Sequence, residues 1–312
     1  MVDSSPTASK PVAAAPAPGL APVDSPWRRL AAEFAESRLA LAGLAMLLTV
    51  IAVAIAAPMI SPQNPYDLAQ LDVMDSKLEP GEKSASGHTY WLGTDDQGRD
   101  LLSGIFYGLR ISLGVGVAST VFAVAIGLTL GLAAAYFGGW VDTVIMRVAD
   151  IQLSFPAILI ALILLAVLGQ GVDKIIVALV TVQWAYYART VRSSALVERQ
   201  KEYIEAAKVL ALSQSRIVFR HLLPNCLPPL IVVATVQVAH AIALEATLSF
   251  LGLGLPITEP SLGLLISNGF QYLLSGKYWI SFYPGVALLV TIMAINLVAD
   301  QLRDILNPRL KR

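Results

Sequence analysis

Long apolar runs separated by shorter polar segments cover most of the chain. A bilayer core of about 30 Å requires about 20 apolar residues in a helix, and six runs meet or approach that length. They cover residues 39–60, 111–137, 151–172, 175–188, 222–244 and 278–299. We therefore predict an all-α integral membrane protein with six transmembrane helices. The fourth helix must continue past Arg189, because its charge-free run is too short to span alone.

The first apolar run, 39–60, has an alternative interpretation as a cleaved secretory signal. Arginines precede it, and the letters AIAAP near its end resemble a cleavage site. A signal peptide, however, has an apolar core of only about 7–15 residues. The greater length of this run favours a retained span.

The second run, 111–137, contains Gly127 and Gly131 four residues apart. Two small residues at this spacing allow another helix to approach closely in a membrane. We therefore expect the second span to pack tightly against a neighbour through this glycine pair.

The distribution of Lys and Arg predicts the orientation of the spans. If the N-terminus lies inside, all but six of the 22 Lys and Arg residues fall in cytoplasmic segments, as the positive-inside rule requires. Both termini are then cytoplasmic, the segments 61–110 and 253–277 face outward, and the polar segment 198–221 faces inward.

The same pattern divides the chain into four parts. Residues 1–34 begin with a stretch rich in Ala, Pro and Ser, a composition typical of disorder, and are predicted to form a disordered cytoplasmic tail. Residues 35–110 hold the first span and an outer loop, and residues 111–306 hold a core of five spans. Residues 307–312 form a short cytoplasmic tail.

Composition supports a membrane protein and excludes several other classes. Hydrophobic residues make up 56% of the chain and charged residues 14%, against about 25% charged in ordinary soluble domains. The net charge is zero, so nucleic acid is not an expected partner. One cysteine, Cys226, excludes an internal disulfide framework, and the scattered histidines give no metal site.

The inner polar segment, 198–221, is built of helix formers rather than of Gly, Ser and Pro. Ile204, Ala207, Leu210 and Ala211 recur at helical spacing, which places them on one face. A second short helix, 213–222, can begin with Ser213 as its N-cap. Two short helices joined by a bend form either a docking element for another protein or a solvated connector, and this pattern alone leaves both open.

A resemblance favours the first alternative. The letters EAAKVLA…HLLPN, from Glu205 to Asn225, resemble the EAA loop of ABC-importer permeases. In that family the loop is a coupling helix pair between the fourth and fifth spans that inserts into the ATP-binding subunit. By this resemblance the expected ATPase-coupling residues are Glu205, Ala206, Ala207, Lys208, Ala211, Arg216, Leu223 and Pro224.

One coupling position departs from the family pattern. Ala211 stands where the family usually has Gly. If that position requires a positive φ, alanine costs about 1 kcal/mol there. The alternatives are a different bend or a position that never needs a positive φ.

Three further segments narrow the resemblance. They are LGTDDQGRDLLSGIFYGLRISL at 92–113, EATLSFLGLG at 245–254, and NLVADQLRDILNPR at 296–309. All are similar to the second ("C") permease subunit of the dipeptide/oligopeptide/nickel family. Departures from that family stand at Leu262, Ala299 and Asn307.

The resemblance implies a bacterial inner-membrane importer. The partners would be a sister permease in a heterodimer, two ATP-binding subunits carrying ATP and Mg, an extracytoplasmic substrate-binding protein, and membrane lipid. This chain would hold no cofactor and would not be an enzyme. Its substrate, a peptide, a nickel chelate or another small solute, is not specified.

Polar residues within the spans are candidates for the translocation path, since such residues mark function by default. These candidates are Gln183, Gln237, His240 and Glu245. The alternative is that they bind neighbouring helices or cap a loop. His240 and Glu245, five residues apart, cannot share one helix face.

Other polar clusters have local interpretations. Thr94 and Gln97 have the spacing of a capping box, which predicts a helix beginning there, with a turn at Gly98. That outer segment either helps to seat the substrate-binding protein or is only a helix start. Arg147 lies between Asp142 and Asp150 in the sequence, which predicts an ion cluster.

The preferred function is an ATP-driven importer permease. The alternative from another class is a secondary transporter driven by an ion gradient, which requires ionisable groups buried in the membrane. An intramembrane enzyme is disfavoured because the sequence contains no plausible catalytic set.

Overall fold

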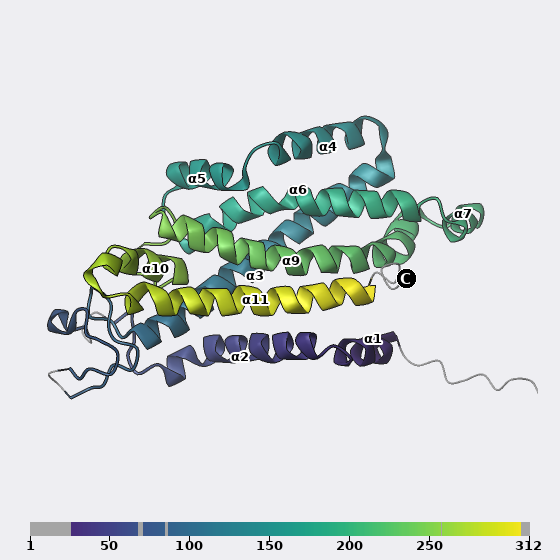
Figure 1. Ribbon diagram of the computed structural model, residues 1–312. Helices are drawn as coiled ribbons and strands as arrows, with labels where there is room; N and C mark the ends of the chain where they lie inside the picture. Colours follow the sequence, from purple (N-terminus) through teal and green to yellow (C-terminus); the bar gives the residue numbers. More distant parts are fainter. Residues whose placement is uncertain (1–25, 68–70, 85–86, 257, 307–312) are drawn as a thin grey trace, which may run out of the picture.

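Long helices lying side by side make up most of the structure (Figure 1). The computed structural model describes residues 26–67, 71–84, 87–256 and 258–306. Over these ranges there is no β-strand, only two isolated bridges, Lys83–Thr89 and Thr94–Asp100. The elements are α1 (Pro26–Ala35), α2 (Arg38–Ile60), η2 (Val73–Asp75), α3 (Leu101–Phe137), α4 (Gly139–Leu153), α5 (Ala157–Leu168), α6 (Val172–Glu198), α7 (Glu202–Val209), α8 (Gln214–Arg216), η3 (Ile217–Leu222), α9 (Leu223–Phe250), α10 (Leu262–Phe270), η4 (Leu273–Ser275) and α11 (Trp279–Leu306).

The long helices form a row with one helix crossing it. In Figure 1, α4 and α5 lie along α6, and α9, α11 and α2 follow in order, with α3 crossing behind the row. The loops between α2 and α3 lie with α10 at one end of the bundle. The α7 segment and the C-terminal end of α11 lie at the other end (Figure 1).

Four helical units in the described residues are long and apolar enough to cross a bilayer. They are α2, α3, the continuous helix formed by α8, η3 and α9, and α11. A fifth results if α4 and α5 count as one broken span. The fourth predicted span, 175–188, corresponds to α6, a helix of 27 residues. It includes Arg189 and Arg192, so its composition alone does not qualify it as a span.

The third predicted span, 151–172, is wrong as a single helix. The chain breaks between α4 and α5, whose axes differ by 91°. Pro156 occupies the N-cap of α5 with ψ 127°, outside the helical region. A proline disfavours the helical conformation in the residue before it and donates no N–H, which explains the break.

The second predicted span, 111–137, begins too late. α3 starts at Leu101 and runs for 37 residues, so a separate outer helix beginning near Thr94 does not form. The N-cap of α3 is Asp100, whose side chain accepts from the Ser103 N–H at 2.9 Å. Thr94 instead donates its hydroxyl to the Asp75 carbonyl at 2.6 Å, so the capping-box prediction is wrong.

The predicted disordered tail, 1–34, also needs correction at its end. Residues 26–34 belong to α1, whereas residues 1–25, like the predicted tail 307–312, lie outside the described residues. α1 packs against α2 and α11, and the Gln301 side-chain amide donates to the Glu33 carbonyl at 3.3 Å. The segment is rich in Ala, Leu, Glu and Arg, which favour helix. The prolines that indicated disorder stop before it.

The glycine pair of α3 brings two backbones together, as expected. A Cβ on Gly127 would lie 2.7 Å from the Trp184 carbonyl oxygen, and a Cβ on Gly131 would lie 2.6 Å from that of Ala188. Real Cβ atoms do not approach so closely. Only glycine therefore permits the observed contact between α3 and α6.

Ion pairs join α6 to α4, but not the pairs that the sequence indicated. Arg192 binds Asp142, with Nη2 2.6 Å from Oδ2, and Arg189 binds Asp150 at 2.5 Å. Arg147 is exposed and enters none of the ion pairs in the described residues. Both acids of α4 pair with α6 rather than with Arg147, so the predicted cluster within one helix is wrong.

Candidate functional site

The segment between α6 and α9 projects from one end of the bundle (Figure 1). It begins with α7, bends at residues 210–213, and re-enters the bundle through α8 and η3. The predicted second short helix, 213–222, is not separate, because η3 continues into α9 without a break. In η3 the Leu223 N–H donates to the Val218 carbonyl five residues earlier. This wider π turn precedes Pro224, whose ring would clash with a carbonyl in a regular helix.

The inner face of α7 packs on η3. Ile204, Ala207 and Ile217 are buried together, with Leu212 packed against them. Leu210, which the pattern placed on the same face, is 73% exposed. The helix ends at Val209, so helical periodicity no longer governs the direction of the following side chains.

The outer face of α7 is only partly polar. Glu205 and Ala206 are exposed, as are Val209 at 86% and Leu210 at 73%. Ala206 and Val209 are three residues apart and share one face of α7, and Leu210 is exposed at the cap just beyond Val209. We call Glu205, Ala206, Val209 and Leu210 the α7 contact surface. Its apolar half was missed by the sequence reasoning, which assigned Leu210 to the core.

The other predicted coupling residues are divided between exposed and packed positions. Lys208 and Arg216 are exposed, and Ala211 lies at the bend. Pro224 is exposed at the start of α9, and Leu223 is half-buried there.

The bend has the hydrogen bonds of a Schellman motif. The N–H of Ala211 donates to the Lys208 carbonyl at 3.0 Å, and that of Leu212 donates to the Ala207 carbonyl at 3.1 Å. Ala211 occupies the position after the helix cap with φ 52°, where glycine is preferred. Of the alternatives considered above, the structure therefore shows a positive φ at this position, adopted by alanine instead of glycine.

Hydrogen bonds anchor α7 to the ends of α6 and α9. The Tyr203 hydroxyl donates to Glu198 Oε2 at 2.7 Å and accepts from Asn225 Nδ2 at 3.1 Å. Lys201 pairs with the other oxygen of Glu198 at 2.5 Å. Burial, together with the hydrogen bond to Glu198, raises the pKa of Tyr203 to about 12. No local sequence pattern indicates this network, since its bonded pairs are three, five and 22 positions apart.

Three candidate path residues meet in one pocket. Gln183 of α6 and Gln237 and His240 of α9 line a hollow of about 420 Å³ between α5, α6 and α9. Gln183 and Gln237 are almost fully buried, whereas His240 is exposed. The structure thus brings these three candidates together.

Glu245 lies elsewhere, as its angular offset from His240 predicted. It is fully buried, and its carboxylate accepts from the hydroxyls of Ser112 on α3 and Ser249 on α9, each at 2.8 Å. The Ser261 hydroxyl, just before α10, hydrogen-bonds to it as well. Glu245 therefore ties together two long helices and the α10 segment, which corresponds to the capping alternative.

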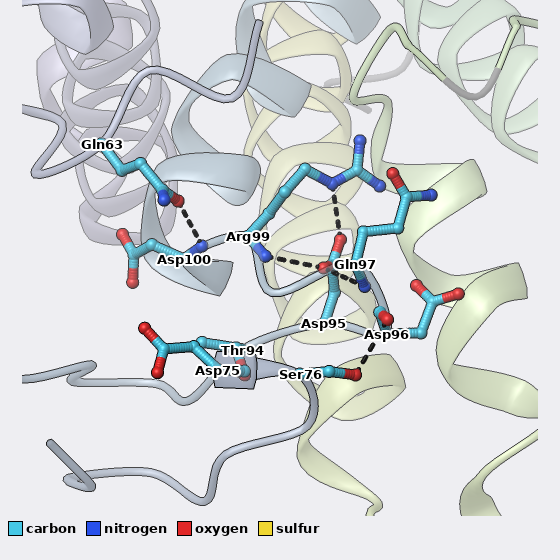
Figure 2. Close-up of polar contacts among 9 residues, drawn as sticks. All are labelled: Gln63, Asp75, Ser76, Thr94, Asp95, Asp96, Gln97, Arg99 and Asp100. Atoms are coloured by element: carbon cyan, nitrogen blue, oxygen red, sulfur yellow. Dashed lines mark hydrogen bonds and ion pairs between the residues drawn. The ribbon is translucent and has the colours of Figure 1, made fainter. Parts of the chain in front are cut away.

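The segment before α3 forms a compact polar network, seen in Figure 2. Asp95 accepts from the backbone N–H groups of Gln97 and Arg99 and from Arg99 Nε, the last at 2.7 Å. Gln63 accepts from the Asp100 N–H at 2.7 Å. The turn at Gly98 is confirmed, with φ 77°.

Asp96 lies in the same network beside Asp95, where a metal site could be considered. Burial, and then the charge of Asp95, raise the pKa of Asp96. Over the described residues no cluster of three or more His, Cys, Asp or Glu has a geometry that could hold a metal ion.

Comparisons with known proteins agree with this architecture. The family of binding-protein-dependent transport system inner membrane components matches residues 127–312. The N-terminal transmembrane domain of oligopeptide transport permease C matches residues 25–80. A solved structure, the inward-facing MetNI methionine ABC transporter, is similar in fold, with a TM-score of 0.52 and 24% identity over 64% of this chain and 94% of that one.

Curated relatives cover nearly the whole chain. The dipeptide transport system permease protein DppC of Alkalihalophilus pseudofirmus is 37% identical over 92% of this chain and 91% of its own. The glutathione transport system permease protein GsiD of Pectobacterium atrosepticum is 35% identical over 93% of each chain. A putative peptide transport permease of Brucella suis is 40% identical over 86% of this chain and 87% of its own. With these relatives and a family match over more than half of its length, the chain belongs to the binding-protein-dependent transport system inner membrane components, as a permease subunit of an ABC importer.

Proposed function

We propose that this chain is the second permease subunit of a peptide importer and that α7 is its coupling helix. The observation that carries the proposal is the α7 contact surface, which exposes Val209 and Leu210 on a helix held firmly by Tyr203 and Ile204. An exposed apolar face on an anchored helix is what a protein partner requires. A solvated connector would need neither the anchoring nor the apolar side chains.

The partner of this surface would be an ATP-binding subunit. A pair of such subunits would hold ATP and Mg, and this chain would hold neither. For nucleotide to move the spans, the α7 contact surface must bind the ATPase more tightly in one of its two states. Glu205 and Ala206 begin the segment that resembles the EAA loop, so we assign this contact to them, with Lys208, Arg216 and the bend at Ala211 beside it.

The chain would cross the membrane six times, with α6 and the α4–α5 pair each counted as one span. The charges of α6 argue against its crossing the membrane, since a lone charge is costly in lipid. Arg189 and Arg192 are paired with Asp150 and Asp142, which lowers that cost. An even number of spans places both termini on one side, and the Lys and Arg bias makes it the cytoplasm.

The pocket of Gln183, Gln237 and His240 would form part of the translocation path, completed by a sister permease. Its lining offers amide, imidazole and hydroxyl groups, which suit the backbone of a short peptide. An extracytoplasmic binding protein would deliver the substrate at the opposite end from α7. The relatives named for dipeptide and glutathione transport support a peptide or peptide-like solute.

Site-directed cross-linking of the complete complex tests the coupling role. The described part of the chain has one cysteine, Cys226, which is buried, so an introduced cysteine reports with little background. Ala206→Cys is expected to cross-link to an ATP-binding subunit, to a degree that changes with nucleotide. Ser275→Cys, exposed at the other end of the bundle, is the matched control and should not cross-link.

Transport measurements complete the test. Ala206→Trp should reduce both retention of the ATP-binding subunits and ATP-dependent uptake in proteoliposomes, while Ser275→Trp should leave retention of the ATP-binding subunits unchanged. Unimpaired uptake by Ala206→Trp would refute the coupling role. Uptake by this chain alone under a proton gradient would instead support a secondary transporter.

A further inference from the structure

A groove on the outside of the bundle lies apart from the path and from α7. It has a volume of about 530 Å³ and is formed by α2, α3, α9 and α11. Its lining is almost entirely apolar and includes Leu47, Ile51, Ile55 and Val117. Ile55 and Val117 are 74% and 49% exposed, so the groove opens to the surroundings of the bundle, which for these helices is lipid.

One charged residue, Arg110, lines this groove. It is exposed and enters none of the ion pairs within the described ranges. Glu259 interacts instead with the Tyr66 hydroxyl, close to which the charge of Arg110 also lies. Over the described residues, then, no carboxylate forms an ion pair with Arg110, and the nearby Glu259 is engaged by the Tyr66 hydroxyl.

Arg110 lies at the level expected for lipid headgroups. It immediately precedes the charge-free part of α3, 111–137. Tyr107, one turn earlier, stacks edge-on against Tyr66 with ring centroids 5.4 Å apart. Tyrosines gather at the membrane–water interface. From Arg110 the groove extends to Val117, roughly 10 Å along the helix, towards the bilayer centre.

The groove also contains space that no side chain of the described structure fills. Gly114, one turn beyond Arg110, lines it, and a Cβ built there would meet no atom within 4 Å. Gly116, which lies two residues further along α3 and outside the groove lining, differs, since a Cβ there would lie 2.6 Å from Ile242. The open space over Gly114 is therefore part of the apolar groove, on the side of Arg110 that faces the bilayer centre.

We propose that this groove binds one anionic phospholipid, with the headgroup phosphate on Arg110 and an acyl chain over Gly114. Charge complementarity selects the occupant. A guanidinium binds a phosphate through paired hydrogen bonds, and an unneutralised arginine favours a lipid with a net negative charge. The apolar groove runs from that charge towards the bilayer centre and fits an acyl chain attached to the headgroup. A free phosphate ion would leave the apolar part of the groove unfilled.

Native mass spectrometry of the full permease complex, purified in mild detergent and stripped of lipid, tests the proposal. Phosphatidylglycerol and phosphatidylcholine are added separately. The wild type should retain one phosphatidylglycerol more tightly than phosphatidylcholine, and excess inorganic phosphate should not displace it. Arg110→Gln should weaken phosphatidylglycerol binding about fivefold, and Arg110→Lys should restore part of it.

The groove itself is tested by filling it. Gly114→Leu should abolish retention of the bound lipid. Gly285→Leu is the matched control, because Gly285 of α11 is also a helix glycine with nothing within 4 Å but lies outside the groove. Arg147→Gln is the matched control for charge. Both controls should retain lipid like the wild type.

Equal retention of the two lipids by the wild type would overturn the proposal, and so would undiminished phosphatidylglycerol binding by Arg110→Gln. A third contrary result is that the wild type binds no lipid and the Gly114→Leu variant loses the sister permease. The last would identify the groove as a protein interface. Lipid retention is measured without ATP or transport, so this result is independent of the coupling role of α7.

Discussion

The backbone N–H of Leu212 donates to the carbonyl oxygen of Ala207, 3.1 Å away, across a bend centred on Ala211. This bond closes the end of α7 and allows Leu212 to pack on the same small core as Ala207. The closure requires a positive φ at Ala211, which is 52°. The shape of the α7 segment therefore depends on a backbone conformation that alanine adopts at a cost.

Replacing Ala211 with glycine should stabilise the bend by about 1 kcal/mol, because glycine adopts a positive φ without a steric penalty. Hydrogen exchange of the Leu212 amide should slow by about fivefold. Ala211→Val, a β-branched residue, should accelerate the same exchange. Equal exchange in all three proteins would contradict the strain assigned to this position.

Replacing Glu245 with alanine should destabilise the complex by about 1–3 kcal/mol, since the hydroxyls of Ser112, Ser249 and Ser261 lose a buried acceptor. Thermal unfolding of the purified complex gives the measurement. Glu245→Gln retains one acceptor oxygen and should lose less. If the alanine variant unfolds at the wild-type temperature, Glu245 does not hold α10 to the bundle.

Alkaline pH should loosen α7. The pKa of Tyr203 is about 12 in the folded chain and about 10 in an unfolded one, so the neutral phenol stabilises the fold. Its contribution is complete below about pH 10 and is lost as pH rises through about 12. Proteolysis of the segment 199–213 should accelerate over this interval. Tyr203→Phe should cleave faster at neutral pH and lose that pH dependence.

Gly131→Ala should weaken the contact between α3 and α6. Its Cβ would lie 2.6 Å from the Ala188 carbonyl oxygen, and relieving such a clash in a packed interior costs about 1–3 kcal/mol. The melting temperature of the complex should fall. Gly285→Ala, which places a Cβ in open space, is the control and should melt at or above the wild-type temperature.

Much of the fold could be predicted because lipid imposes a simple length rule. The spans now observed as α2 and α11 were predicted to within a few residues at their outer ends, since each is an uninterrupted apolar run. The break before α5 depends on a single proline, Pro156. Apolar composition on both sides of it concealed the change of direction.

The candidate site was harder to predict because its geometry depends on non-local contacts. The sequence located α7 and indicated the importance of Ala211, but it assigned Leu210 to the core. Nothing near Tyr203 in the sequence indicates that Asn225 will bind its hydroxyl. The meeting of Gln183 with Gln237 likewise requires α6 to pack beside α9, which periodicity does not reveal.

The unbroken helix from Gln214 to Phe250 has a mechanical consequence. A single continuous helix of this length acts as a lever, because a tilt at one end is carried along its axis to the other. Gln237 and His240 lie more than 20 residues from its inner tip, roughly 35 Å along the axis. A tilt of a few degrees imposed beside Phe219 therefore becomes a sideways displacement of both groups by an ångström or more.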